Sequence, residues 1–209
     1  MNIGIIGAGN VGKALGETWL KKGHRVCFSY SRDLEKLRGY AAGLGTNAAA
    51  GTPAEAAAFG PVVVLAAPWP AVEDALRAAG PLNGKILVDC TNPVKPDLSG
   101  LAIGHTSSAA EEIARRVPGA KVVKAFNTTG AENMRNPQFG SGRASMFVCA
   151  DAPEAKSVVV GLARDAGFEV VDAGLLNVAR LLEPLAMLWI HLAYGQKMGA
   201  GFAFTLLKR

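Results

Sequence analysis

Short runs of aliphatic and β-branched residues alternate with helical stretches from the first residues of the chain to about residue 173. This alternation predicts strands that are buried on both faces and separated by helices, as in a parallel sheet with helices on either side. We expect strands at residues 2–6, 25–29, 47–49, 62–66, 85–89, 121–125, 145–149 and 169–172. The first six suit a parallel, doubly wound sheet, so the predicted fold class is α/β.

Helices are predicted between these strands, at residues 11–22 and 34–43 and after three capping signals. Thr52, Ser108 and Asp151 each place a side-chain oxygen three residues before a glutamate, which is the spacing of a capping box. Segments 92–106 and 130–143 are rich in Gly, Pro, Asn and Ser, which predicts irregular loops of the kind that border binding clefts. Residues 177–194 return to a helical, strongly apolar pattern, which predicts a small C-terminal helical cap on the sheet.

Composition narrows the class of protein. The 209 residues suffice for one domain, alone or with a modest C-terminal extension. Half of the residues are hydrophobic and only 19% are charged, which excludes a disordered chain. Cys27, Cys90 and Cys149 are odd in number and each lies in an apolar run, which favours reduced core thiols over disulfides or a metal site. We therefore expect a cytoplasmic protein.

The net charge of +5 does not indicate a nucleic-acid partner, because the basic residues are scattered along the chain. A positive field around an anionic cofactor or substrate is the simpler interpretation. Met1 is followed at once by a predicted strand, without a basic leader, so we expect no signal peptide. The apolar residues 181–194 are interrupted by Glu183, Pro184 and His191 and fall short of the roughly 20 residues of a membrane span. We therefore expect no membrane partner.

A glycine motif connects the first predicted strand to the helix after it, with the sequence Gly7-Ala8-Gly9-Asn10-Val11-Gly12. In dinucleotide-binding folds the first glycine permits a tight turn, the second lets the backbone approach the pyrophosphate, and the third lets helix and strand pack closely. The amino terminus of the helix then offers free N–H groups and the positive end of its dipole to the anion. We predict that these six residues bind a dinucleotide; the alternative is a glycine turn that binds nothing.

The end of the second predicted strand indicates which dinucleotide is bound. An NAD site normally has Asp or Glu there to hold the ribose 2′-hydroxyl, whereas this chain has Ser31 and Arg32. A serine hydroxyl and a guanidinium can bind a 2′-phosphate, which a carboxylate would repel, so the pair predicts NADP. Asp33 is better placed to begin the next helix. The alternative is that Ser31 caps this helix and Arg32 is a solvated surface residue.

Ligands of doubly wound sheets lie beyond the carboxyl ends of the strands. Ala66, Ala67 and Pro68 follow the fourth predicted strand, and their small or rigid side chains would let a flat cofactor pass close to the backbone. We include them in the predicted cofactor site. Trp69 comes next, and either walls the pocket or packs on the following helix.

The other polar residues expected near the cofactor are amides rather than acids or bases. Asn92 and Asn127 each follow a later strand and suit the nicotinamide carboxamide, although both are also ordinary turn positions. His24, His105 and His191 lie beside no nucleophile motif, so we assign no catalytic residue and no metal ligand. Hydride transfer between two planar rings needs mainly proximity and alignment, so a chain without a catalytic base fits that chemistry.

With these residues, the chain resembles the family of NADP oxidoreductases that depend on the deazaflavin coenzyme F420, which also includes the NADPH–flavin domain of the six-transmembrane metalloreductases. The resemblance covers nearly the whole chain and rests on residues 5–12, 31–32, 85–93, 122–127 and 172–175 leading to 182–183. The middle segments are the most specific, because many unrelated dehydrogenases share the glycine motif. Segments Thr91-Asn92-Pro93 and Phe126-Asn127 look closer to the metalloreductase branch.

The resemblance implies a Rossmann-type NADP-binding domain at residues 1–174 and a helical extension at residues 175–209 that contributes to the acceptor site or a dimer interface. It implies NADP(H), with Ser31 and Arg32 on the 2′-phosphate, and a planar small-molecule acceptor (FAD, FMN or coenzyme F420) stacked on the nicotinamide. We expect an NADP-dependent oxidoreductase. Two alternatives stay open: a hydroxyacid, carbonyl or imine reductase, which normally needs a longer helical domain, and a non-catalytic NADP(H)-binding redox sensor.

A homodimer is expected because the C-terminal helix carries a large apolar stripe. Leu185, Leu188, Trp189 and Leu192 recur at helical spacing and form a surface too large to leave in water. The stripe is expected to pack on the sheet or on a second subunit, close to the nicotinamide end of the cofactor.

Overall fold

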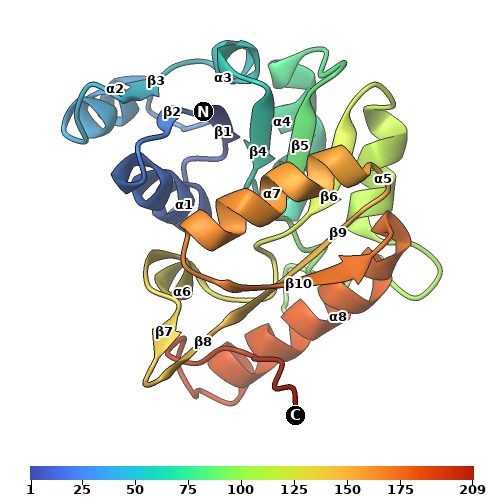
Figure 1. Cartoon of the computed structure of the whole chain (residues 1–209). Helices are drawn as coiled ribbons and strands as arrows, with labels where there is room; N and C mark the ends of the chain where they lie inside the picture. Colours follow the sequence, from blue (N-terminus) through green and yellow to red (C-terminus); the bar gives the residue numbers. More distant parts are fainter.

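The computed structural model describes residues 1–209 and is built around one eight-stranded sheet (Figure 1). The strand order is β10-β9-β6-β5-β4-β1-β2-β3. The strand bounds are β1 Asn2–Ile6, β2 Arg25–Ser29, β3 Ala48–Ala50, β4 Val62–Leu65, β5 Ile86–Asp89, β6 Lys121–Lys124, β9 Ser145–Ala150 and β10 Glu169–Gly174. Strands β1 to β6 are parallel and follow the 3-2-1-4-5-6 order of Rossmann folds, so the predicted class and the six parallel strands are confirmed.

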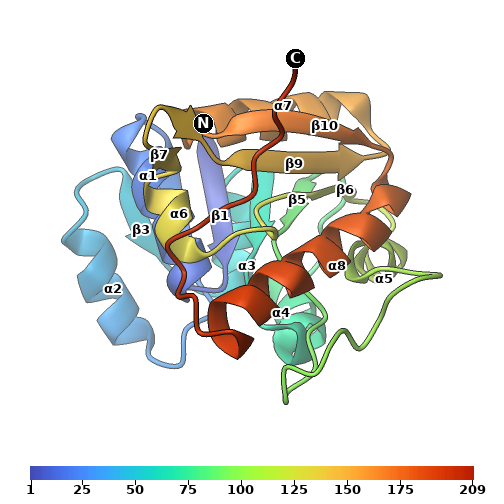
Figure 2. The same ribbon diagram turned by 90° about the horizontal axis from the view of Figure 1, so that it is seen from below.

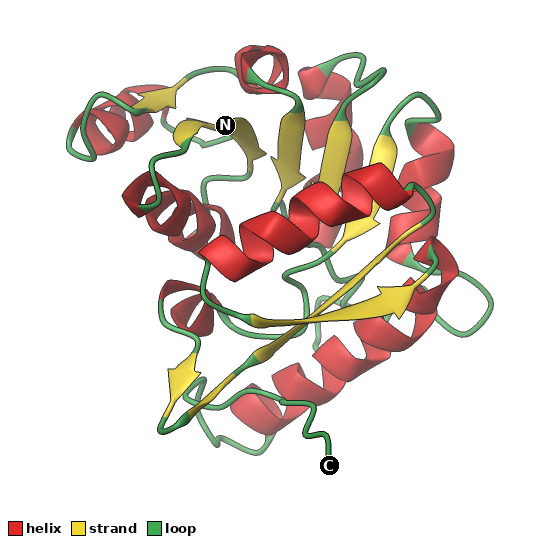
Figure 3. Cartoon of the chain, in the orientation of Figure 1, coloured by secondary structure: helices red, strands yellow, loops and turns green.

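Helices cover both faces of the sheet (Figure 3). Their bounds are α1 Asn10–Lys21, α2 Leu34–Ala42, α3 Pro53–Phe59, α4 Val72–Ala79, α5 Ala109–Arg116, α6 Ala131–Arg135, α7 Pro153–Asp165 and α8 Ala179–Ile190. One apolar core lies under α1 and α7 and includes Trp19 and Val159. The other lies under α4, α5 and α8 and includes Leu76, Ile113 and Leu182. Because both faces of the strands are buried, the strands read as nearly continuous apolar runs.

The second half of the sheet departs from the parallel pattern. Strand β9 is antiparallel to β6, and β10 is parallel to β9 through the helix α7 that crosses the strands in Figure 1. The expectation of an irregular loop at residues 130–143 was wrong in part, because this segment contains α6 and a hairpin of β7 (Gln138–Phe139) and β8 (Gly142–Arg143). These short elements depend on tertiary contacts: the Asn133 side chain in α6 donates to Thr129 Oγ1 and to the Phe202 carbonyl.

Two of the three predicted helix caps are present. Thr52 forms a full capping box with Glu55 at the start of α3, and Ser108 accepts from the Glu111 amide at the start of α5. The prediction for Asp151 was wrong, because α7 begins at Pro153 and has no side-chain cap. The Asp151 carboxylate instead accepts a hydrogen bond from the Leu176 amide, so it fixes the turn that leads into α8.

The C-terminal helical run is longer than expected. A 3-10 turn before α8 and a π-helical turn after it extend the run to Leu176–Gly195, 20 residues that are long and apolar enough to cross a membrane by length and composition. The expectation that this stretch is too short for a span was therefore wrong. In this structure α8 packs on the sheet, and buries Glu183 and Trp189.

The chain after α8 turns back over the molecule, as the dark red segment of Figure 2 shows. Phe202 stacks on Trp189, and its carbonyl accepts from the indole N–H of the same tryptophan. Further on, the Phe204 carbonyl accepts from the Ser145 amide at the start of β9. The tail thereby joins α8 to the start of β9.

Candidate functional site

A cavity of about 760 Å³ opens at the carboxyl ends of β1, β2, β4 and β5. Most of the residues that the sequence predicted for a cofactor line it: Gly7, Ala8, Gly9, Asn10, Val11, Ser31, Arg32, Ala66, Ala67, Pro68 and Asn92. Gly12 and Asn127 do not line it. The cavity wall also includes residues that the prediction omitted or left open: Tyr30, Trp69, Ala71, Cys90 and Thr91.

The three glycines of the first loop have three different surroundings. Gly7 has a φ of +117°, and a Cβ there would lie 2.5 Å from the Ala66 carbonyl carbon. A Cβ on Gly12 would lie 2.0 Å from the Gly7 carbonyl oxygen, so this glycine lets α1 approach the loop. A Cβ on Gly9 would meet no atom within 4 Å. The fold therefore requires Gly7 and Gly12, whereas Gly9 leaves open space on the cavity side.

The first turn of α1 is free to bind an anion. Gly9 is the residue that precedes the helix and supplies no side-chain cap, and the first turn carries no acidic side chain. Unpaired amide groups at a helix amino terminus, together with the helix dipole, attract negative charge. The helix start therefore has the chemistry of a phosphate site.

The segment after β2 places a free cation at the cavity edge. Tyr30 has a left-handed backbone, with a φ of 57°, and its hydroxyl donates to Asp74 at 3.1 Å. Burial and the neighbouring Asp74 raise the pKa of Tyr30. The Ser31 hydroxyl contacts only the backbone of Asp33, and Asp33 itself caps α2 by accepting from the Lys36 amide. Ser31 is therefore not the helix cap.

Arg32 is exposed and makes no ion pair or side-chain hydrogen bond. The nearby arginine Arg38, by contrast, pairs with Glu35 on α2. A cavity-lining guanidinium without an internal partner is available to an anionic ligand.

Both of the roles considered for Trp69 are present in the structure. It lines the cavity, and it also packs on the apolar core under α4. Ala66 and Ala67 precede it and keep the cavity floor flat, with Ala67 only 4% exposed.

Asn92 and Asn127 form a reciprocal pair across the ends of β5 and β6. The Asn127 side-chain Nδ2 donates to Asn92 Oδ1 at 3.0 Å, and the Asn92 Nδ2 donates to the Asn127 carbonyl oxygen at 2.9 Å. Asn127 Nδ2 also donates to the Leu182 carbonyl of α8. Asn127 is buried and lies behind Asn92, so it holds a residue of the cavity wall rather than forming that wall itself.

A buried charge cluster lies beneath this end of the cavity. Lys124 Nζ contacts Asp89 Oδ2 and Glu183 Oε1, each at 2.9 Å, and all three side chains are buried. Glu183 also accepts from the amides of Ala109 and Ala110 at the start of α5. Burial raises the pKa of Glu183, and the two carboxylates raise that of Lys124 against the opposing effect of its burial. The sequence prediction did not include this cluster, although Lys124 within an apolar strand was a signal for it.

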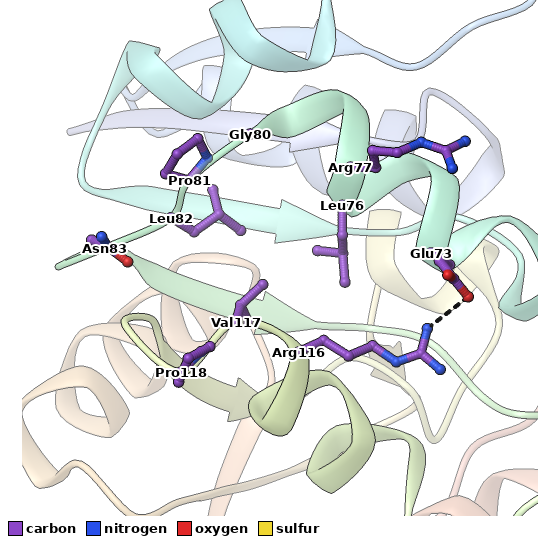
Figure 4. A pocket seen from close by; sticks show the side chains of 10 residues that line it. All are labelled: Glu73, Leu76, Arg77, Gly80, Pro81, Leu82, Asn83, Arg116, Val117 and Pro118. Carbon is purple, nitrogen blue, oxygen red and sulfur yellow. Dashed lines mark hydrogen bonds and ion pairs between the residues drawn. The ribbon is translucent and has the colours of Figure 1, made fainter.

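A second hollow of about 440 Å³ lies between α4 and α5 (Figure 4). It is at the opposite, amino-terminal ends of β5 and β6. Arg116 in its wall pairs with Glu73 at 3.1 Å, and Arg77 pairs with Asp74. Its arginines are thus already neutralised by the protein, which leaves the cavity at the strand ends as the candidate site.

None of the three histidines lines the cavity. His24 contacts Asp165 at 3.0 Å near the amino terminus, and both His105 and His191 are exposed outside the cavity. The three cysteines are free and buried. Burial raises the pKa of the Cys27 thiol to about 11 and that of Cys90, in the cavity wall, still further.

The sequence model of a family described as NADP oxidoreductase, coenzyme F420-dependent, matches residues 2–93. The F420-dependent NADP reductase of Methanothermobacter marburgensis is 30% identical over 165 residues, which are 75% of this chain and 73% of that relative. This chain belongs to the F420-dependent NADP oxidoreductase family. A provisionally assigned F420-dependent NADP reductase from Arthrobacter sp. FB24 has a similar structure, with a TM-score of 0.88, 33% identity and complete coverage of both chains.

Two other similar proteins are longer than this chain. The metalloreductase STEAP3 of Rattus norvegicus is 34% identical over 187 residues, and the chain spans 36% of its length. A reductive aminase from Aspergillus terreus has a TM-score of 0.68 at 21% identity, with 94% of this chain and 62% of that chain covered, which is a likeness of fold alone. The family is one of NADP-dependent oxidoreductases, and this chain has the Rossmann-like fold of its relatives.

Proposed function

We propose that this family member transfers a hydride between NADP(H) and a planar flavin-type acceptor, with coenzyme F420 as the first candidate and FAD or FMN as the alternatives. The observation that carries the proposal is the cavity at the strand ends, which runs from the free Arg32 guanidinium past the glycine loop to the flat floor at Ala67. A dinucleotide with a charged 2′-phosphate at one end and an uncharged ring at the other has the matching distribution of charge.

The residues in the cavity fit NADP(H). Ser31 and Arg32 would hold the 2′-phosphate, and the open space at Gly9 with the first turn of α1 would hold the pyrophosphate. Ala66, Ala67 and Pro68 would border the nicotinamide end, together with Asn92, whose side chain is held by Asn127. When bound, NADPH supplies the hydride.

No acid or base is assigned to the transfer itself. The titratable groups close to the nicotinamide end are Cys90, whose raised pKa keeps it a neutral thiol, and the cluster of Lys124, Asp89 and Glu183, which lies behind the wall. The protein would act by aligning two rings and by excluding water, which is sufficient for hydride transfer.

The choice of coenzyme F420 as first acceptor rests on the relatives. The family description and the Methanothermobacter marburgensis relative name this coenzyme, and the Arthrobacter sp. FB24 protein, which this chain covers completely, is provisionally assigned the same activity. The rat metalloreductase is the reason to keep flavins as alternatives, because its 34% identity extends over 88% of this chain.

We further propose that residues 175–209 act as an extension that joins two copies of the chain in a homodimer, with no nucleic-acid or membrane partner. Leu181 and Leu188 lie on the outward side of α8 at 68% and 48% exposure, with the exposed Pro184 between them. This outer face has no charged side chain between Leu181 and Leu188 that would keep it in water. Sedimentation equilibrium at several protein concentrations tests the dimer.

The activity is tested by following NADPH oxidation at 340 nm with oxidised F420, FAD, FMN and quinones in parallel. We expect turnover with F420, or with a flavin if the acceptor is of the kind expected for the metalloreductase branch. A protein that binds NADPH but oxidises it with no acceptor would be a binding protein rather than a reductase. Turnover with imines or carbonyl compounds alone would replace this proposal with a reductase of that class.

A further inference from the structure

Thr91 occupies an unusual position in the cavity wall. It is 3% exposed, it lines the cavity, and its hydroxyl oxygen Oγ1 is buried without any hydrogen-bond partner. A buried hydroxyl normally finds a partner, because leaving it unpaired costs stability. Asn127 Oδ1 is also buried and unpaired, but Asn127 does not line the cavity, so Thr91 is the one of the two that belongs to the cavity wall.

The backbone of Thr91 is fixed on both sides by buried ions. Its amide donates to Asp89 Oδ1 at 2.8 Å, and its carbonyl accepts from Lys124 Nζ at 2.6 Å. Both ions are fully buried and contact each other. Charge-assisted hydrogen bonds in a buried site are stronger than neutral ones, so they restrict the movement of the residue. The backbone of Thr91 is therefore firmly positioned, whereas its side-chain hydroxyl makes no hydrogen bond.

The neighbours of Thr91 do not offer a comparable group. The Asn92 amide is engaged with Asn127, Cys90 is a weak donor, and Ala67 and Trp69 complete an apolar surrounding. A single hydroxyl in such a surrounding is suited to one carbonyl oxygen on an otherwise flat, apolar ring.

We infer that the Thr91 hydroxyl donates a hydrogen bond to a carbonyl oxygen of the ring ligand at the inner end of the cavity, and so determines how that ring is oriented. The inference rests on the proposed function and adds to it a residue that the predicted site omitted. Two ring ligands carry such a carbonyl: the nicotinamide, in its carboxamide, and a flavin or deazaflavin, in its pyrimidine ring. Asp89 and Lys124 are positioning residues for this contact.

The variant Thr91→Val tests the inference, because valine has the same shape and lacks only the hydroxyl. In the wild-type protein this hydroxyl has no partner, so the variant should unfold at the same temperature or higher. Its affinity for the ring ligand should fall about tenfold, which corresponds to about 1.4 kcal/mol. Thr91→Ser keeps the hydroxyl and should restore most of the affinity.

Thr18→Val is the matched control. The Thr18 hydroxyl donates to the carbonyls of Ala14 and Met134, and Thr18 lies on α1 outside the cavity. This variant should lower the unfolding temperature and leave ligand affinity unchanged. The two valine variants thus have opposite expected effects on stability and binding, which a purely structural role for Thr91 would not produce.

Three ligands distinguish the possible contacts: NADPH, 2′-phospho-ADP-ribose, which lacks the nicotinamide, and the active acceptor. Weaker NADPH binding by Thr91→Val, with the fragment unchanged, supports a contact to the nicotinamide. A raised acceptor KM with NADPH binding unchanged supports a contact to the acceptor ring. Equal loss for NADPH and the fragment, or no loss for any ligand, overturns the inference. If the wild-type protein binds neither NADPH nor the fragment, the proposed function fails and the inference fails with it.

Discussion

The side chain of Asn127 donates to Asn92 Oδ1, and the side chain of Asn92 donates back to the Asn127 carbonyl oxygen, so each residue fixes the other. Asn127 follows β6 and is buried, whereas Asn92 lines the cavity. Asn127 follows Phe126, which has a left-handed backbone with a φ of 59°. Strained residues of this kind persist where the surroundings determine them, and they concentrate at functional sites. Asn127 is therefore best understood as the support for Asn92.

This pair predicts non-additive effects in a double-mutant cycle. Asn127→Ala should slow hydride transfer more than tenfold, because Asn92 Oδ1 loses the Asn127 Nδ2 donor that holds it and the bond from Asn127 to the Leu182 carbonyl is lost as well. The double variant with Asn92→Ala should be no slower than the worse single variant, because the two residues act as one unit. Single-turnover rates for the four proteins provide the measurement. Additive losses would show that each amide acts on the ligand independently.

The glycine loop predicts a separation of stability from binding. Gly9→Ala should change the free energy of unfolding by less than about 1 kcal/mol, because the new Cβ meets no atom within 4 Å. NADPH binding should nevertheless weaken roughly tenfold or more, because the methyl group would fill the space proposed for the pyrophosphate. Gly7→Ala should instead destabilise the protein by about 1–3 kcal/mol, since its φ of +117° is strained for alanine. Urea unfolding and calorimetric titration measure the two effects.

Much of this loop was predictable from the sequence, whereas the support behind it was not. The roles of Gly7 and Gly12 follow from a local motif between one strand and one helix, and Asp33 was correctly placed as the start of α2. The prediction that Asn127 binds the cofactor rested on its position after a strand. That position does not reveal which partner its side-chain amide bonds to, and in the structure the partner is Asn92. Asn92 lies 35 residues earlier in the chain, so the pairing depends on the tertiary fold.

The buried cluster of Lys124, Asp89 and Glu183 was also not predictable from the sequence, because its members are far apart in the chain. Lys124 and Asp89 are 35 residues apart, and Glu183 reaches the start of α5 across a separation of 74 residues. Only the sheet order and the packing of α8 bring these groups together. Asp151 failed as a helix cap for a related reason, because the distant Leu176 amide competes successfully for its carboxylate.

Arg32 predicts the choice between NADP(H) and NAD(H). Arg32→Ala should weaken NADPH binding by roughly one to two decades, because a charge-assisted bond to the 2′-phosphate contributes about 1.5–3 kcal/mol. NADH binding should change little. Arg38→Ala is the control, because that arginine is also exposed but is paired with Glu35. Equal affinity of the wild-type protein for the two cofactors would remove the proposed role of Ser31 and Arg32.

The ion pair between Glu111 and Arg180 predicts a pH-dependent contribution to the attachment of α8. Hydrogen bonds from Arg180 lower the pKa of Glu111 below its ordinary value of 4.5. A depressed carboxyl pKa stabilises the fold above the unfolded value, and this stabilisation is lost as pH falls through the folded value. Arg180→Met should therefore unfold more easily than the wild type at pH 7, and the difference should shrink below pH 4.5. A difference that is constant from pH 7 to pH 3 would exclude the ion pair as its cause.

The position of the histidines predicts that the chemical step needs no side-chain acid or base. In the proposed transfer, a hydride would pass from C4 of the nicotinamide to a ring atom of the acceptor, which would require the two atoms to lie about 3–3.5 Å apart. His105→Ala and His191→Ala should leave the single-turnover rate within about tenfold, because neither residue lines the cavity. Ala67→Leu should lower the rate further, because Ala67 is 4% exposed in the cavity floor and a larger side chain would displace the ring.

NADPH deuterated at C4 identifies the step that these variants affect. A primary isotope effect on the single-turnover rate, with the label recovered in reduced F420, would support direct transfer. With a flavin, exchange at N5 removes the label, so the isotope effect alone must decide. If His191→Ala abolished the chemical step while NADPH still bound, proton transfer by a side chain would be required, and a carbonyl or imine reductase would become the better assignment. We expect the opposite result, because His191 is exposed, its side chain contacts Gln196 at 3.3 Å, and it does not line the cavity.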